Sequence, residues 1–254
     1  MQASNKFEDL VEIVKILRKE CPWDRKQTHR SIKDNLIEEA YESVEAIDKN
    51  DFEELKKELG DLLLHVIFHS RMASETDDFE IEDVIYSIQE KLIRRHPHVF
   101  SDSNAMDEQE VAKNWETIKM EEGKESVLDG LPAHLPALIK AQRMQEKAAN
   151  VGFDWPEWRQ VWEKLEEEFD ELKEVLEEGD LEKSKEEFGD VLFSLVNVGR
   201  FFNLNAEDSL RLTNNKFFKR FRYIEKQVKN SDRTMNEVSL KEMDGLWEEA
   251  KTND

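Results

Sequence analysis

Residues 38–61 read EEAYESVEAIDKNDFEELKKELGD, and residues 167–190 read EEFDELKEVLEEGDLEKSKEEFGD. The second stretch lies over the first without a gap after a shift of 129 positions. In both stretches apolar residues recur at helical spacing on either side of a turn signal, near Asn50 in one and at Gly179 in the other. This pattern predicts two copies of a helical hairpin and therefore an internal duplication.

Composition predicts that the rest of the chain is helical as well. The 254 residues include only 8 Gly and 5 Pro, and apolar and charged residues each make up 38%. Such a chain forms its core from apolar stripes on amphipathic helices. We expect an all-α protein with two tandem repeated helical-bundle domains, at residues 1–122 and 137–254, joined by a Gly- and Pro-containing linker at 123–136. The expected helices cover about 6–19, 32–47, 51–74, 81–95 and 107–123, and then 137–149, 158–178, 181–202, 206–229 and 240–251.

Net charge, cysteine content and the lengths of apolar runs limit the binding partners and the cellular location expected for this protein. The net charge of −22 opposes binding to nucleic acid or to an anionic membrane surface. The single Cys21 cannot form a disulfide within the chain, the first residues do not resemble a signal peptide, and no apolar run reaches the length of a membrane span. We therefore expect a cytoplasmic protein without nucleic-acid or membrane partners.

Carboxylates coincide at the repeated positions. A solvated acidic face would explain any one glutamate pair in so acidic a chain, but not a matched set. In an antiparallel hairpin that turns near residue 50, Glu42 lies level with Glu58 and Glu39 lies level with Asp61. Converging carboxylates repel one another unless a cation binds, and oxygen ligands favour Mg²⁺ or Mn²⁺. The predicted metal ligands are Glu39, Glu42, Glu58 and Asp61 in the first half and Glu168, Glu171, Glu187 and Asp190 in the second.

Glycine interrupts each acidic set, because Gly60 and Gly189 lie between the last two predicted ligands. Glycine within a helix costs about 1 kcal/mol relative to alanine. We infer that the missing side chain lets a ligand or a facing helix approach.

Cationic and aromatic residues recur later in each half. Lys91 and Arg95 are four residues apart on one predicted helix, as are Lys216 and Arg220 on another. A tryptophan precedes a lysine by four residues in two places, at Trp115–Lys119 and Trp247–Lys251. Such groups can hold phosphates and cover a base or sugar, although surface cations and core tryptophans are the ordinary alternatives.

The histidines of the first half are not repeated at the equivalent positions of the second half. A carboxylate-bridged di-iron bundle needs Glu-x-x-His on two helices, and neither half has it. His65 and His69 correspond to Ser194 and Val198 in the second half. We therefore assign these two histidines to packing or solvent contact rather than to ligation.

Several motifs together resemble the MazG family. They are CPWD, EExxE followed by ELGD, RRHPHVF, NWETIK and LPALIKAQRMQEKAANVGFDW, and they extend over nearly the whole chain. The resemblance implies the all-α NTP pyrophosphatase fold, a homodimer, and Mg²⁺-dependent cleavage of nucleoside triphosphates to monophosphate and pyrophosphate. Carried onto this chain, it implies metal binding by the second acidic set and nucleotide binding by Lys183, Lys216, Arg220, Trp247 and Lys251.

The first half departs from this pattern at one position, because Glu54 occupies the place of Lys183. In such a mechanism a carboxylate orients or deprotonates the attacking water, and Glu167, Glu168 and their neighbours are all possible bases. The competing hypotheses are a nucleotide or metal sensor without turnover and a purely structural acidic bundle. The matched acidic sets argue against the latter.

Overall fold

The structure is a computed structural model that describes residues 2–101, 111, 118, 122–123 and 125–252. It divides into two compact units, residues 1–105 and 106–254. The described residues form helices and turns and contain no β-strand, which confirms the all-α prediction. None of the described helices combines the length and the apolar character needed to cross a bilayer.

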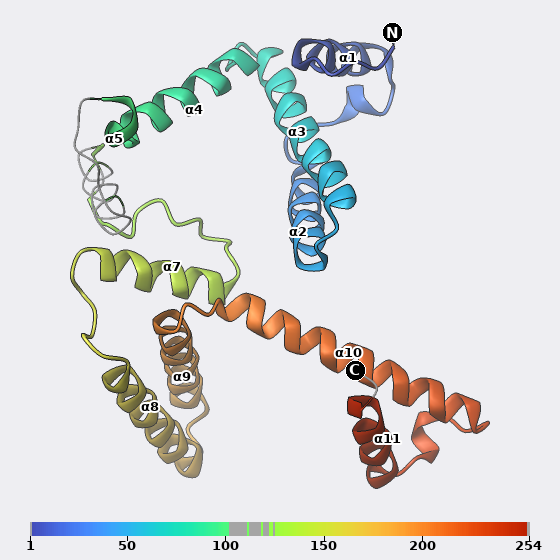
Figure 1. Cartoon of the computed structure of the whole chain (residues 1–254), viewed down its shortest axis with the longest axis vertical. Helices are drawn as coiled ribbons and strands as arrows, with labels where there is room; N and C mark the ends of the chain where they lie inside the picture. Colours follow the sequence, from blue (N-terminus) through green and yellow to red (C-terminus); the bar gives the residue numbers. More distant parts are fainter. Residues whose placement is uncertain (1, 102–110, 112–117, 119–121, 124, 253–254) are drawn as a thin grey trace. The chain divides into compact units, whose positions relative to one another are not determined.

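The first unit is built around a hairpin of two long helices (Figure 1). Its helices are α1 (Phe7–Glu20), the short 3₁₀ helix η1 (Asp24–Lys26), α2 (Lys33–Lys49), α3 (Phe52–Ser74), α4 (Ile81–Arg95) and α5 (Pro97–Phe100). The main core cluster joins Val14 of α1 to Ile67, Phe68 and Met72 of α3. This core holds the second half of α3, so that the first half of α3 faces α2 and carries the acidic residues.

The second unit contains the corresponding hairpin. Its helices are α7 (Ala137–Asn150), α8 (Trp158–Glu178), α9 (Leu181–Phe201), α10 (Ala206–Asn230), the 3₁₀ helix η2 (Met235–Glu237) and α11 (Leu240–Thr252). Here α8 packs along α9, α9 also contacts α7, and α11 packs against α10. The core between α10 and α11 contains Ile224, Val228 and Val238.

The two hairpin turns have the same construction. Asn50 ends α2 in the left-handed conformation with φ 53°, and Gly179 ends α8 with φ 77°. The next residue caps the following helix in both cases: Asp51 accepts a hydrogen bond from the Glu54 amide, and Asp180 accepts from the amides of residues 182 and 183. A left-handed residue followed by an aspartate cap reverses the chain within two residues. The predicted turns and the duplication of the hairpin are therefore confirmed locally.

The predicted linker is described at residue 123 and from residue 125 onward. Residues 125–136 form turns without a helix, and the Asp129 carboxylate accepts hydrogen bonds from the amides of Glu125 and Ser126. Most of the helix expected at 107–123 lies outside the described residues. The boundaries at 123–136 therefore stay a prediction.

Candidate functional site

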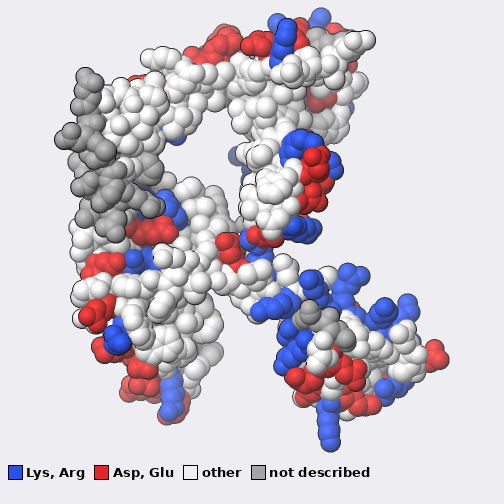
Figure 2. Space-filling view, in the orientation of Figure 1, with Lys and Arg blue, Asp and Glu red and all other residues white. Residues whose placement is uncertain are grey.

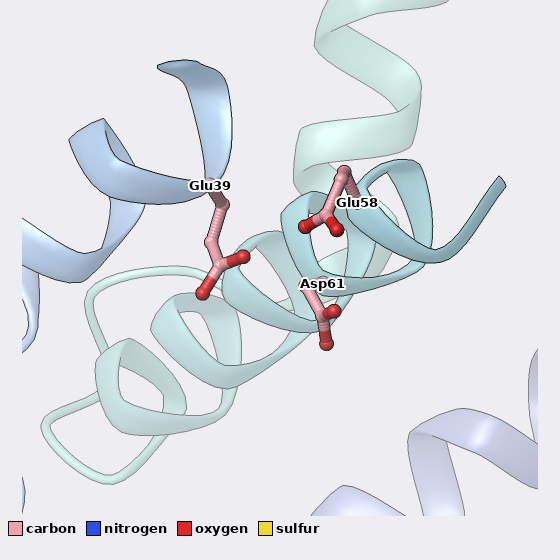
Figure 3. A group of neighbouring side chains, drawn as sticks. All are labelled: Glu39, Glu58 and Asp61. Carbon is pink, nitrogen blue, oxygen red and sulfur yellow. The ribbon is translucent and has the colours of Figure 1, made fainter. Parts of the chain in front are cut away.

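The first acidic cluster lies between α2 and α3. Glu39 comes from α2, and Glu58 and Asp61 come from α3, with carboxylate oxygens that all lie within 4.8 Å of one another. Figure 3 shows the three side chains directed toward a common space between the two helices. Glu42 borders this group, because its carboxyl contacts that of Glu39. The hairpin thus brings three of the four predicted carboxylates close together, with Glu42 beside them but outside the close group.

Burial and mutual repulsion raise the pKa values of two carboxyl groups in the first cluster. Burial and the carboxylates of Asp61, Glu42 and Glu58 raise the pKa of Glu39 above its ordinary value. The pKa of Glu58 is raised by burial and by Glu42 and Glu54. Glu58 is only 8% exposed and forms no ion pair with any residue that the structure describes. A buried carboxylate without a counter-charge is costly, so the cluster favours a bound cation or a bound proton.

A polar cavity opens beside this cluster. Its volume is about 240 Å³, and its lining includes Glu42, Glu54 and Glu58 together with Lys49. Lys49 pairs with Glu45 across one turn of α2. The cavity therefore leaves space next to the acidic oxygens for water or for part of a ligand.

The second acidic cluster repeats this arrangement between α8 and α9. Oxygens of Glu168, Glu171 and Glu187 lie within 4.8 Å of one another. Asp190, the fourth predicted ligand, lies on α9 one turn after Glu187, is exposed and is not part of this close group. Burial and the neighbouring carboxylates raise the pKa of Glu171, against the opposing effect of Lys164.

Lys164 distinguishes the second cluster from the first. Its Nζ lies 2.7 Å from Glu167 and 3.0 Å from Glu168, and these contacts raise the pKa of the lysine. Glu168 is 7% exposed, so Lys164 supplies the counter-charge that Glu58 lacks. The matching position in the first half is Asn35. Sequence reasoning missed this lysine, although its spacing of three and four residues from two glutamates on one helix is a readable signal.

The predicted nucleotide-binding residues of the second half lie on three helices. Lys216 and Arg220 are on α10, Trp247 and Lys251 are on α11, and Lys183 is exposed in the first turn of α9. The Arg220 guanidinium lies over the Trp247 ring at 5.6 Å, and Lys251 pairs with Glu248. Figure 2 shows Lys and Arg side chains, interspersed with Asp and Glu, over α10 and α11. The structure therefore joins Arg220 with Trp247, whereas the acidic cluster lies on α8 and α9.

The equivalent residues of the first half are only partly described. Lys91 is exposed and Arg95 half-buried near the end of α4. The groups that shift the pKa values of Glu39 and Glu58 are carboxylates and not these cations. Trp115 and Lys119 lie outside the described residues.

The glycines of the two acidic motifs face open space. A Cβ built at Gly60 or Gly189 meets no atom of the described chain within 4 Å. A facing helix of the same chain therefore does not require either glycine. The expected approach of a ligand to these glycines stays a prediction.

The acidic donor set fits a hard divalent cation. All donors are carboxylate oxygens, they converge from two helices, and in the first half the buried member lacks a counter-charge among the described residues. Such oxygen-only sites are typical of Mg²⁺ and Mn²⁺. A cation bound there would neutralise the repulsion that raises the glutamate pKa values.

Comparison with known proteins follows the same division of the chain. The sequence model of the MazG nucleotide pyrophosphohydrolase domain matches residues 27–100 and again residues 159–224. The chain is 47% identical over 253 residues to the nucleoside triphosphate pyrophosphohydrolase/pyrophosphatase MazG of Thermotoga maritima, covering 98% of this chain and 96% of that protein. It is 41% identical to the nucleoside triphosphate pyrophosphohydrolase of Escherichia coli, covering 97% of both chains.

A third relative differs in length. An uncharacterized protein of Bacillus subtilis, YabN, is 46% identical over 91% of this chain, but the match covers 48% of that protein.

The two domain matches contain the two hairpins that carry the acidic clusters. Together with the near full-length relatives, they show that this chain belongs to the MazG nucleotide pyrophosphohydrolase family.

Proposed function

We propose that this protein hydrolyses nucleoside triphosphates, NTP or dNTP, to the nucleoside monophosphate and pyrophosphate, with Mg²⁺ as the cofactor and Mn²⁺ as a possible substitute. The observation that carries the proposal is the pair of convergent carboxylate clusters, one in each domain match. The names of the full-length relatives support the reaction class. Regulation or cleaning of the nucleotide pool is the corresponding cellular role.

Charge neutralisation is the main chemical task of the proposed site. A triphosphate brings several negative charges to a surface that is already acidic, so binding requires cations. We assign Mg²⁺ binding in the second half to Glu168, Glu171, Glu187 and Asp190, and in the first half to Glu39, Glu42, Glu58 and Asp61. When bound, the metal ion would polarise phosphate oxygens and compensate their charge.

The protein's own groups supply the remaining functions. Glu167 and Glu168 are the candidate bases, and the Lys164 ammonium contacts both of them. Arg220, already stacked over Trp247, would pair with phosphate while the indole covers the base or sugar. Lys183, Lys216 and Lys251 would add positive charge around the phosphates.

A homodimer is part of the proposal. Leu192 and Leu195 of α9 are 40% and 44% exposed, and Gly189 faces open space on the same helix. Helices with uncovered apolar residues gain stability when they pack against other helices. A second copy of the chain would cover these residues and could bring its α10 and α11 toward the acidic cluster. Light scattering at working concentration should give twice the chain mass. The expected cytoplasmic location stays a prediction.

Product analysis tests the reaction. Purified full-length protein is incubated with a panel of triphosphates and Mg²⁺, and the products are separated by ion-exchange chromatography. We expect monophosphate and pyrophosphate, and no turnover after chelation of divalent ions. Initial formation of diphosphate and orthophosphate would contradict the proposal. Nucleotide binding without turnover would support the sensor hypothesis instead.

Matched amide substitutions test which half is active. The resemblance and the presence of Lys183 favour the second half, so Glu171→Gln should lower kcat on the order of 100-fold, as for loss of one electrostatic stabiliser. Glu42→Gln at the equivalent position of the first half should have a much smaller effect. A loss of about half the activity in each variant would show instead that both halves are active.

A further inference from the structure

The polar cavity beside the first acidic cluster lies on the side of the α2–α3 turn. Its volume is about 240 Å³. Its lining consists of Glu42, Glu45, Ala46 and Lys49 of α2, Asp51 of the turn, and Glu54 and Glu58 of α3. Among the described residues that line it, Lys49 alone is cationic. We call this space the turn cavity.

The second half repeats most of this lining. A shift of 129 residues places Glu171, Glu174, Val175, Asp180 and Glu187 on Glu42, Glu45, Ala46, Asp51 and Glu58. Four of these pairs are identical acidic residues, and the fifth replaces alanine by valine. The two hairpins therefore keep this end alike.

The two remaining positions of the lining differ by an exchange of charge. Lys49, the last residue of α2, corresponds to Glu178, and Glu54, in the first turn of α3, corresponds to Lys183. Each hairpin thus carries one lysine and one glutamate at these positions, with the lysine before the turn in the first half and after it in the second. The exchange retains a positive charge at this end of both hairpins, whereas simple loss of the Lys183 counterpart would have removed it.

The surroundings of Lys49 show that its ammonium faces both arms of the hairpin. A hydrogen bond to Glu45 raises the pKa of Lys49, and the carboxylates of Asp51 and Glu54 on the far side of the turn raise it further. Glu54 itself pairs with Lys57 on α3, and Lys49 pairs with Glu45 on its own helix. The Lys49 side chain is 64% exposed, and exposed pairs within one helix contribute little. This flexible lysine can therefore exchange Glu45 for another anion at small cost.

We propose that Lys49 holds the phosphates of a nucleoside triphosphate in the turn cavity, which makes the first acidic cluster part of a second nucleotide-binding site. The inference rests on the proposed function, because it uses the same class of ligand and the same metal ion. Lys49 would act in the first half as Lys183 is proposed to act in the second, but from the opposite arm of the hairpin.

Electrostatics explain why this position needs a cation. Glu45, Asp51 and Glu54 present negative charge to the cavity and would repel a triphosphate. A divalent ion at the acidic cluster compensates charge at the far end of the cavity from the turn. Lys49 supplies positive charge at the turn, and a charge-assisted contact with phosphate is among the stronger hydrogen bonds.

The proposal concerns binding and leaves turnover with the second half. Lys164 contacts both candidate bases, Glu167 and Glu168, and its counterpart in the first half is Asn35. The first site therefore lacks a cation that the second site holds next to its candidate bases. We expect nucleotide to bind at both sites and to be hydrolysed rapidly only at the second.

Calorimetric titration with non-hydrolysable triphosphates tests the site without measuring activity. The ligands are the α,β-methylene analogues of ATP, GTP, CTP and UTP, added with Mg²⁺ to the full-length protein. Glu168→Gln and Glu187→Gln are present, so that the second cluster does not bind metal. We expect one analogue molecule per chain. Lys49→Gln should raise its Kd roughly 10-fold or more, because the change removes a charged hydrogen-bond donor to phosphate.

An exchange variant provides the sharper control. Lys49→Glu alone should abolish most of the binding, whereas Lys49→Glu/Glu54→Lys gives the first half the arrangement of the second and should restore it. Lys56→Gln removes a cation of α3 that pairs with Glu53 and does not line the cavity, and it should bind as the parent does. Circular dichroism establishes that each variant is folded.

Metal binding without nucleotide separates phosphate contact from a structural role. Lys49→Gln removes positive charge near the acidic cluster, so Mn²⁺ alone should bind as tightly as before or more tightly, as measured by electron paramagnetic resonance. Phosphate contact predicts the opposite change for the nucleotide. Weaker binding of both ligands would overturn the assignment, because it would mean that the substitution damages the hairpin.

Three other results would also overturn the assignment. The first is an unchanged Kd for the analogue in folded Lys49→Gln, and the second is failure of the exchange variant to recover the binding lost in Lys49→Glu. The third is absence of binding in the first half while the wild type binds and hydrolyses triphosphates, in which case the proposed function stands without the second site. A wild type that neither binds nor hydrolyses any triphosphate contradicts the proposed function and this assignment together.

Discussion

Lys164 should weaken metal binding in the second half, and exchange of this residue with its counterpart Asn35 tests the idea. Lys164→Asn removes the positive charge that lies 2.7 Å and 3.0 Å from two site carboxylates. Asn35→Lys introduces a lysine at the equivalent position of the first half. We expect the first change to tighten divalent-metal binding in the second half and the second change to weaken it in the first half.

Two limits bound the size of the effect. If Lys164 swings away when the metal ion binds, the cost is the loss of two partly exposed ion pairs, about 1 kcal/mol in all, or roughly 5-fold in Kd. If it stays, a monovalent and a divalent cation about 4 Å apart in water repel by about 2 kcal/mol, or roughly 30-fold. The water value is appropriate because the lysine side chain is 37% exposed.

Electron paramagnetic resonance of Mn²⁺ measures this effect directly, because free Mn²⁺ gives a sharp signal. The Lys164→Asn titration is done with Glu39→Gln and Asp61→Asn present, so that the second cluster alone binds metal. The Asn35→Lys titration is done with Glu168→Gln and Glu187→Gln present, so that the first cluster alone binds metal. An unchanged or higher Kd for Mn²⁺ in Lys164→Asn would refute the electrostatic reasoning. Lys173→Asn, a change elsewhere on α8, controls for loss of helix propensity.

Three further predictions follow from the clusters and the turns. Because the folded-state pKa values of Glu39 and Glu58 are raised, the folded protein binds these protons more tightly, and metal-free stability should fall as pH rises above about 4.5 through the raised pKa values. Urea titrations across pH should show this fall, and Glu39→Gln/Glu58→Gln should remove much of it; an unchanged slope would contradict the assignment. Gly189→Ala should stabilise the metal-free monomer by about 0.5–1 kcal/mol, because the added Cβ meets no other atom. The same variant should have lower activity if substrate or a second chain approaches this position. Full activity would mean that neither approaches it. Asn50→Ala should cost about 1 kcal/mol in thermal unfolding, because Asn50 is left-handed, whereas Asn50→Gly should be nearly neutral; equal losses would contradict this.

The sequence by itself determined the helical architecture and the repeat. Apolar spacing placed α3 and α9 within one or two residues of their observed ends, and the turns near Asn50 and at Gly179 were predicted as well. These features are local, because helix periodicity and capping depend on residues only a few positions apart. Equal distances from the turn also predicted that carboxylates of the two helices meet, since a short turn fixes the register of an antiparallel hairpin, but they did not predict that Glu42 and Asp190 lie outside the close groups.

Only the tertiary structure decided what surrounds those carboxylates. The periodicity indicates that Glu58 and Glu168 point toward the partner helix, but it cannot show that Lys164 neutralises one cluster while the other lacks a counter-charge among the described residues. It likewise cannot bring His29 against His69, which lies 40 residues away. Such contacts depend on how the chain between them folds back, and the free energy of a charged or polar group depends on burial and on neighbours that are distant in sequence.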